Sequence, residues 1–142
     1  MNNTILQANI SPCTETEFLV IKKLIADFCL DDNDLHPEQF LVAKYEGKIV
    51  GFGRLRQYPV CNELCSLGVI EDLRLKGIGR QLTLALSEKA TLPLYLVAII
   101  PDFFSKLGFS EISDFPSEIG IKLKYCIETL SVPETYVVMK LN

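Results

Sequence analysis

The sequence has few of the side chains that build zinc sites. It contains one histidine, and its five cysteines form no CxxC pair. Cys61 and Cys65 form CxxxC without matching histidines or a second cysteine pair, which argues against zinc. His36 precedes Pro37 in an acidic loop, so we expect it to be solvated. We therefore expect reduced, mostly buried thiols and no bound metal.

Positive charge and long apolar runs are also scarce. The net charge is −4, whereas contacts to phosphates need a basic surface, so we expect no nucleic-acid partner. No segment approaches the roughly 18 apolar residues of a membrane helix, so we expect no membrane partner. The first residues, MNNTILQANISPC, lack the basic and then apolar pattern of a secretory signal. The sequence therefore predicts a cytoplasmic protein.

The first half of the chain predicts one helix among several strands. We find no repeat, low-complexity tract or linker, so we expect one domain over residues 1–142. A strand is predicted over ILQANI, and a helix over EFLVIKKLIADFCL, which follows the threonines at 14 and 16. QFLVAKY and IVGFGRLRQY flank the turn EGK and predict a hairpin. ELCSLGVI predicts the next strand.

The second half predicts helices that alternate with strands. A helix over QLTLALSEKA is followed by a strand, LYLVAII, and by a short helix, PDFFSKLGF, that Gly108 closes. Another helix begins at Ser117 and ends at Pro133, and TYVVMKL predicts the final strand. The order of elements predicts an α/β (α+β) fold with a mixed, mostly antiparallel sheet and helices on both faces. The helix from Ser117 is predicted to place four apolar residues on one face: Ile119, Leu123, Ile127 and Leu130.

The stretch RLKGIGR, residues 74–80, places two glycines at the start of a predicted helix. Each glycine costs roughly 1 kcal/mol relative to alanine inside a helix, so their presence needs a reason. The first backbone amides of a helix have no internal partners, and glycines let an anion approach them closely. A P-loop is excluded because no GK is followed by Ser or Thr, and Leu82 replaces the third glycine of GxGxxG.

The same stretch has a second interpretation. Gly77 and Gly79 could serve only the close packing of helix on sheet, with the neighbouring cations forming a solvated face. The charge favours the anion site, because this acidic chain gathers three cations around one helix start: Arg74, Lys76 and Arg80.

Residues 74–79 resemble the Q/R-x-x-G-x-G/A signature of the GNAT acyltransferases. FFSKLGF, residues 103–109, resembles the second landmark of that family, an aromatic-rich helix that ends in K-x-G-F. The predicted order of elements is similar to the GNAT fold over nearly the whole chain. The resemblance implies acetyl-coenzyme A as co-substrate, with its pyrophosphate on the glycine loop. It implies a cofactor site made of Leu67, Gly68, Val69, Arg74, Leu75, Lys76, Gly77, Ile78, Gly79, Arg80, Phe103, Phe104 and Lys106.

Glu63 is the candidate catalytic base. It begins the strand ELCSLGV and lies 11 residues before Arg74, the offset at which the histone-acetyltransferase branch of the family carries its catalytic glutamate. The alternative is a strand-end carboxylate exposed to solvent. The resemblance also implies a backbone amide near Gly68 and Val69 that polarises the thioester carbonyl. Gly68 marks a bulge there or is a packing glycine.

The general acid is where the chain departs from the family. Many members have tyrosine at the position of Phe104, so the proton donor is left open among solvent, Ser105 and Tyr95, and Tyr95 also fits a core aromatic. Arg54 and Arg56 occupy alternate positions of one strand and point to one face. They either hold a substrate carboxylate or form an ordinary exposed pair.

Three stretches resemble the small-molecule branch of the family, which includes N-acetylglutamate-synthase-like and arsenic-resistance acetyltransferase-like domains: ELCSLGV, DFFSKLGF and the ending FPSEI to VPETYVVMKL. We predict an N-acetyltransferase in which the amine of a small molecule, with amino acids among the candidates, attacks acetyl-coenzyme A directly in a ternary complex. Cys65 has no histidine near it in sequence, which argues against an acyl-enzyme. The alternative is a non-catalytic module that binds acyl-coenzyme A or a protein partner. A homodimer stays open, because dimers are common among relatives.

Overall fold

The computed structural model describes residues 4–130 and 135–142. Its strands are β1 (Asn9–Pro12), β2 (Phe40–Tyr45), β3 (Lys48–Gln57), β4 (Asn62–Val69), β5 (Leu94–Ala98), β6 (Phe109–Glu111) and β7 (Val137–Leu141). All of these described strands belong to one sheet in the order β1-β2-β3-β4-β5-β7-β6. Neighbours pair antiparallel except β4 and β5, which pair parallel. The predicted mixed, mostly antiparallel sheet is confirmed.

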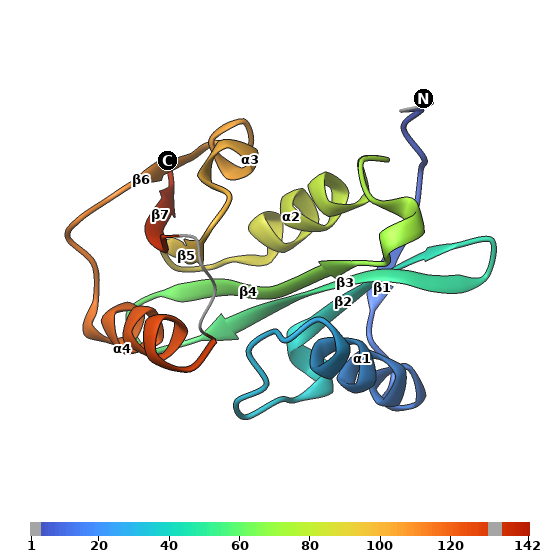
Figure 1. Ribbon diagram of the computed structural model, residues 1–142, viewed down its shortest axis with the longest axis horizontal. Coiled ribbons are helices and arrows are strands. Elements are labelled where there is room, and N and C mark those ends of the chain that lie inside the picture. Colours follow the sequence, from blue (N-terminus) through green and yellow to red (C-terminus); the bar gives the residue numbers. More distant parts are fainter. Residues whose placement is uncertain (1–3, 131–134) are drawn as a thin grey trace.

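Helices cover both faces of the sheet (Figure 1). They are α1 (Glu15–Asp27), α2 (Ile78–Lys89), α3 (Pro101–Ser105) and α4 (Ser117–Tyr125), with 3₁₀ turns at Pro37–Gln39 and Glu71–Leu73. Side chains alternate along β2: Leu41 joins the apolar cluster that includes α2 and α3, whereas Phe40 and Val42 pack on Ile21 and Ile25 of α1. The α4 residue Ile119 packs on the α1 side of the sheet, over β5 and β7.

The helix α1 begins and ends at local signals. Thr14 caps it: its hydroxyl accepts a hydrogen bond from the backbone of Glu17, and the Glu17 carboxylate accepts one from the backbone of Thr14. The helix ends at Asp27, three residues before the predicted end, because Cys29 adopts a left-handed backbone with φ of 56°.

The first strand begins at Asn9 and not at Ile5, as the sequence predicted. The preceding residues bind to the start of α2. The backbone N–H of Leu6 donates to the carbonyl of Lys76, while the Gln81 side chain donates to the carbonyl of Leu6 and accepts from the N–H of Ala8. The N-terminal segment therefore supports the glycine loop instead of extending β1.

The C-terminal half differs from the prediction in two places. A π-helical turn over Cys126–Leu130 continues α4 and rotates the predicted apolar face. Ile119 is fully buried, but Ile127 is 58% exposed and Cys126 is buried instead. The predicted end at Pro133 lies outside the described residues. The strand β6, three residues long, was not predicted. It follows Gly108, whose φ of 96° closes the turn after α3 as predicted.

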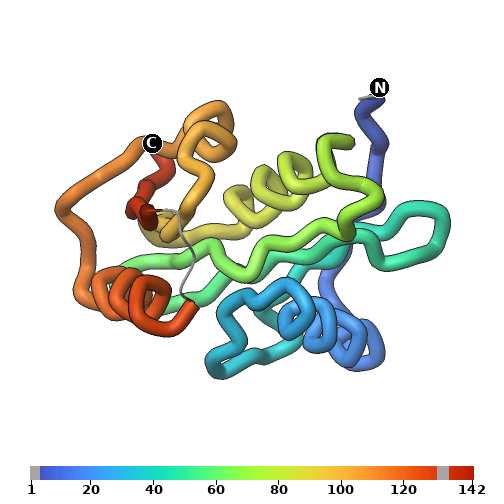
Figure 2. Tube along the Cα trace, viewed as in Figure 1, coloured from blue at the N-terminus to red at the C-terminus, as the bar shows by residue number. Residues whose placement is uncertain are grey.

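The strands β4 and β5 separate soon after they pair. Only Asn62 with Leu94 and Glu63 with Tyr95 are paired between them, and β5 then continues along β7. Figure 2 shows α4 and the end of the chain at one end of the sheet, with the β2–β3 turn at the other. The separation leaves a gap in the middle of an otherwise continuous sheet.

We expect Thr14→Ala to lower the free energy of unfolding by about 1 kcal/mol, because the first amides of α1 lose their cap. Thr16→Ala is the matched control, since Thr16 is exposed and should change stability by less than about 0.5 kcal/mol. Urea unfolding of both variants measures the difference. Equal effects would mean that Thr14 does not cap the helix.

Candidate functional site

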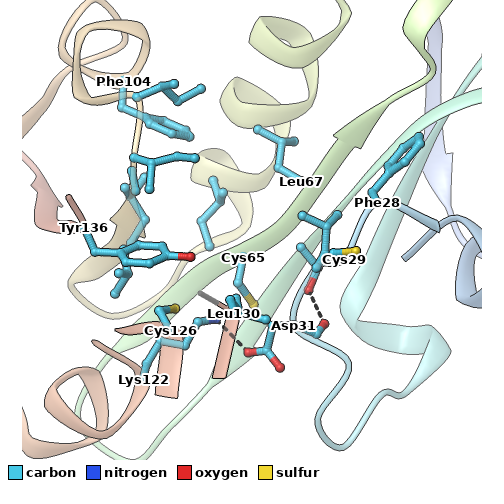
Figure 3. A pocket seen from close by; sticks show the side chains of 18 residues that line it. Phe28, Cys29, Asp31, Cys65, Leu67, Phe104, Lys122, Cys126, Leu130 and Tyr136 are labelled. Atoms are coloured by element: carbon cyan, nitrogen blue, oxygen red, sulfur yellow. Dashed lines mark hydrogen bonds and ion pairs between the residues drawn. The ribbon is translucent and has the colours of Figure 1, made fainter. Parts of the chain in front are cut away.

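A cavity of about 360 Å³ lies between the separated strands; we call it the central cavity. Its lining is mostly apolar and comes from distant parts of the chain, as Figure 3 shows. β4 contributes Leu64 to Leu67, the end of β5 and the two residues after it contribute residues 96–100, and α3 contributes Phe104. The rest of the lining is Phe28, Cys29, Leu30, Asp31, Lys122, Cys126, Leu130 and Tyr136.

The bulge in β4 lies at Ser66 and Leu67, earlier than the predicted position at Gly68 and Val69. Pairing with β3 passes from Cys65 directly to Gly68, so two residues of β4 have no partner in the register. Ser66 has a φ of 48°, and its hydroxyl donates to the carbonyl of Asp31 at 2.9 Å. The bulge turns this stretch of β4 toward the central cavity and away from β3.

Gly68 is a packing glycine, which was the alternative interpretation. A Cβ at this position would lie 2.7 Å from the ring of Phe52 and 2.9 Å from that of Phe28. Those distances are shorter than real Cβ contacts, so the two rings occupy the space that a larger residue would need.

A second cavity of about 300 Å³, the glycine-loop cavity, opens at the start of α2. The structure gathers ten of the thirteen predicted cofactor residues around it: Leu67, Gly68, Val69, Arg74, Leu75, Gly77, Ile78, Gly79, Arg80 and Phe103. Phe104 lines the central cavity instead. Lys76 contributes its carbonyl to Leu6, Lys106 is exposed, and neither lines these two cavities.

The two glycines of the loop have different reasons to be glycine. Leu75 and Gly77 have φ of 66° and 87°, and such alternation of left-handed residues points successive N–H groups to one side. Gly77 is therefore required by its backbone. Gly79 has no such φ, and a Cβ there would lie 3.5 Å from the Phe103 ring, an ordinary contact. Close helix–sheet packing accordingly does not explain Gly79.

Glu63 belongs to a buried charged cluster. Its side chain is fully buried, so the exposed strand-end carboxylate is the wrong interpretation. The Tyr58 hydroxyl donates to Oε1 of Glu63 at 3.1 Å, and Nζ of Lys122 lies 2.7 Å from Oε2. Nζ of Lys122 also donates to Oδ2 of Asp31 at 2.7 Å. Two carboxylates from distant segments thus share one ammonium.

Burial and charge oppose each other in this cluster. Burial works to raise the pKa of Asp31, but Lys122, the backbone hydrogen bond from Asn33 and the charge of Arg54 together outweigh it, and the pKa lies below its usual value. Burial works to lower the pKa of Lys122, yet the surrounding anionic groups raise it overall. Burial raises the pKa of the Cys65 thiol to about 12, so Cys65 is neutral near pH 7 and the carboxylates supply the negative charge. A neutral thiol is a poor nucleophile, which agrees with direct transfer.

Arg54 is not available to a substrate, which corrects that prediction. It is fully buried, and its guanidinium donates to the side chain of Gln39 and to the carbonyls of Asn33 and Asp34. The alternative, that Arg54 and Arg56 form an ordinary exposed pair, is also wrong, because Arg54 is buried and the Arg56 side chain is only 19% exposed.

Arg56 lines a third cavity, the outer cavity, of about 240 Å³. Its Nη1 lies 3.8 Å from Oδ2 of Asp31. Asp31 and Lys122 also line the central cavity, so the two cavities share a wall. The other residues of the outer cavity are Asn33, Tyr58, Glu118, Ile121 and Tyr125.

Asp31, Lys122 and Tyr136 line these cavities but were not predicted from the sequence. Asp31 stood in a polar loop and Lys122 in an amphipathic helix, where both are usually solvated. Figure 3 shows the Tyr136 ring in the central cavity with its hydroxyl directed toward the β4 side. Tyr95 is 7% exposed and packs with Ile119, as the core interpretation expected. Tyr136 was predicted to lie within the final strand, whereas β7 begins at Val137, and a tyrosine in a predicted strand carries no signal of its position in the cavity.

Within residues 4–130 and 135–142, no three His, Cys, Asp or Glu side chains are grouped to hold a metal ion. None of the helices in these ranges has the length and apolar character needed to cross a membrane.

Residues 7–109 match the model of the acetyltransferase (GNAT) family. The chain therefore belongs to the GNAT acetyltransferase family, and the resemblance drawn from residues 74–79 and 103–109 is confirmed. A protein of Chlorobaculum tepidum, an uncharacterised N-acetyltransferase, is 32% identical over 113 residues, which cover 75% of this chain and 73% of the relative. Family and relative together support an acetyltransferase.

Solved structures share the fold at low sequence identity. N-acetylglutamate synthase of Neisseria gonorrhoeae, in complex with coenzyme A and N-acetylglutamate, matches 96% of this chain with a TM-score of 0.76 and 15% identity. This chain spans 36% of that protein's length. Rv2747 of Mycobacterium tuberculosis, in complex with CoA and NLQ, has a TM-score of 0.78 and 21% identity over 94% of this chain and 98% of its own. At these identities the likeness establishes the fold alone.

We expect Lys122→Met to lower the free energy of unfolding by about 3–5 kcal/mol, because it leaves two buried carboxylates without their shared cation. The difference from the wild type should narrow in acid, because the stabilisation from the lowered pKa of Asp31 is lost as pH falls through that pKa.

The matched control is Lys124→Met, because Lys124 lies on the same helix and is exposed. It should change stability by less than about 0.5 kcal/mol. Urea unfolding at neutral and acid pH measures both variants, and a harmless Lys122→Met would mean that the ion pairs contribute nothing to the fold.

Proposed function

We propose that this chain is an acetyl-coenzyme A-dependent N-acetyltransferase that acts on the amine of a small molecule. The observation that carries the proposal is Gly79, which borders the glycine-loop cavity although neither its backbone nor its packing requires glycine. A bound anion that approaches the first amides of α2 would explain why position 79 is glycine. Family membership supplies the chemistry that such a ligand serves.

In this proposal the pyrophosphate of acetyl-coenzyme A binds the amides of residues 77–80, and Arg74 and Arg80 add positive charge. The pantetheine arm passes Val69 and Phe103 and enters the central cavity, whose apolar wall suits it. N-acetylglutamate synthase and Rv2747, which share the fold, were solved with coenzyme A. Backbone amide at the Ser66–Leu67 bulge is the proposed oxyanion donor, in place of Gly68 and Val69.

The acceptor ammonium first gives one proton to the base, and the neutral amine then attacks the thioester carbonyl. Collapse of the tetrahedral intermediate breaks the C–S bond, and the second proton that the nitrogen loses balances the proton that the departing thiolate takes up. Glu63 is the proposed base. It lines none of the three cavities, so it takes the proton through the Tyr58 hydroxyl, which passes its own proton to Oε1 as it receives one from the amine. Tyr136 is the proposed general acid and gives a proton to the departing thiolate. Phe104 stands where many relatives have tyrosine and has no proton to give.

An amino acid is the acceptor that fits the outer cavity. Arg56 would pair with its carboxylate, and the charge of Asp31 would hold its ammonium group nearby. The cytoplasmic location and the homodimer stay predictions. The non-catalytic acyl-coenzyme A-binding module differs from this proposal in one observable, since it would bind the cofactor and acetylate none of the amino acids offered.

We expect Gly79→Trp to abolish calorimetric binding of acetyl-coenzyme A, because the indole fills the anion site. Gly79→Ala is the control, since its Cβ has room beside Phe103, and it should bind more tightly than Gly79→Trp by at least about tenfold. Absence of binding by the folded wild type, or equal affinity of all three proteins, would overturn the cofactor site.

We expect Tyr136→Phe to lower kcat by about 100-fold, the usual contribution of a positioned proton donor, with little change in the affinity for acetyl-coenzyme A. Tyr95→Phe is the control from the core and should keep kcat within about threefold if it folds normally. Steady-state release of coenzyme A, measured with each L-amino acid as acceptor, gives both values. An unchanged kcat would mean that solvent, and not Tyr136, protonates the departing thiolate.

A further inference from the structure

Glu118 is the one charged side chain of the outer cavity that has no ion-pair partner among the residues that the structure describes. Of the other three, Asp31 and Arg56 approach each other to 3.8 Å, and Lys122 lies 2.7 Å from Asp31. Within the same described ranges the Glu118 carboxylate accepts one hydrogen bond, from the Ser117 hydroxyl at 3.4 Å. A bond of that length is weak, so Glu118 keeps its capacity to bind a cation.

The contacts of Lys122 explain why Glu118 is unpaired. Glu118 and Lys122 are four residues apart on α4 with the glutamate first, the spacing and order at which a helix pairs opposite charges best. Here Nζ of Lys122 instead lies 2.7 Å from a carboxylate oxygen of Asp31 and of Glu63. The usual partner of Glu118 is therefore occupied, and the negative charge of Glu118 stays available at the cavity wall.

One face of α4 lines the outer cavity. Glu118, Ile121, Lys122 and Tyr125 follow the spacing i, i+3, i+4 and i+7, so their side chains lie on the same side of the helix. Four residues of helix rise by about 6 Å, which separates Glu118 from Lys122 and from the charges that Lys122 binds. The side chains of ornithine and lysine, with three and four methylene groups, are long enough to span such a separation. Ile121 supplies apolar surface beside that path.

We propose that Glu118 is a specificity-determining residue that selects an L-amino acid with a cationic side chain, such as lysine or ornithine, as the acceptor. This selection rests on the proposed function. Arg56 holds the carboxylate of the acceptor, Asp31 faces its α-ammonium group, and Glu118 pairs with the side-chain ammonium. The α-amine is then the group that is acetylated. Glu118 repels an acceptor with a side-chain carboxylate, such as glutamate, and gains no partner from a neutral one.

The position of Glu118 also suits a purely structural role. It lies in the first turn of α4, where a negative charge stabilises a helix through its dipole. Loss of that role would lower the amount of folded enzyme for every acceptor alike. Selection between acceptors instead changes the ratio of their kcat/KM values, so this ratio separates the two roles.

The first test compares L-lysine and L-ornithine with L-norleucine, which has the carbon chain of lysine without its side-chain ammonium. Release of coenzyme A at several acceptor concentrations gives kcat/KM for each. We expect the wild type to prefer the better of the two cationic acceptors over norleucine by at least about fivefold, because norleucine leaves the half-buried carboxylate of Glu118 unpaired. A smaller ratio, or a product acetylated on the side-chain nitrogen, would overturn the inference.

Substitution of Glu118 is the second test. Glu118→Gln should lower kcat/KM for lysine by at least about fivefold, mainly through KM, and that for norleucine by less than about threefold. Glu118→Lys should raise kcat/KM for L-glutamate relative to that for L-lysine, because the sign of the charge is reversed. Equal losses for lysine and norleucine in Glu118→Gln, or an unchanged glutamate-to-lysine ratio in Glu118→Lys, would contradict the assignment.

The matched control is Glu128→Gln. Glu128 is exposed on the π turn that continues α4, and it lines none of the three cavities. This variant should keep the ratio of lysine to norleucine of the wild type within about twofold, since a substitution far from the acceptor leaves its binding unchanged. A control that loses the ratio as Glu118→Gln does would also overturn the inference.

The wild type separates this inference from the proposed function. A wild type that binds acetyl-coenzyme A but acetylates no L-amino acid overturns the proposed acceptor, and the role of Glu118 with it. A wild type that acetylates norleucine as efficiently as lysine keeps the proposed function and overturns the role of Glu118 alone.

Discussion

The early separation of β4 and β5 is the constraint on which the rest of the molecule depends. Two pairs of residues join the strands, and beyond Glu63 and Tyr95 they diverge. Where a sheet opens in its middle, either side chains pack into the gap or a cavity remains. Here the bulge at Ser66, the turn after α1 and the C-terminal half of the chain surround the gap without filling it, and the central cavity results.

Ion pairs stabilise one wall of that gap, whereas apolar contacts stabilise an ordinary core. Lys122 joins α4 to β4 and to the loop that carries Asp31, and Ser66 ties the same loop to the bulge. These contacts close one side of the opening while leaving ionised groups beside it. Stability and the proposed chemistry accordingly depend on the same few atoms.

Elements that depend on neighbouring residues could be predicted from the sequence, whereas contacts between distant residues could not. The glycine loop at 74–80 and the capped helix after Thr14 follow from neighbouring residues, so their type and position were predictable. Arg54 was misjudged because the loop that buries it lies about 20 residues away. Lys122 was missed because its partner Asp31 is 91 residues distant, and no spacing in a single sequence reports such a pair.

The N-terminal segment, residues 5–8, contacts the loop at the start of α2. Leu6 and Ala8 are bound to Lys76 and Gln81, and the Ile5 side chain lies 3.1 Å from where a Cβ of Gly77 would stand. The segment from Ile5 to Ala8 thus supports the proposed anion loop from behind. Substitutions in residues 5–8 would therefore reach that loop, so a change in this segment bears on ligand affinity as well as on stability.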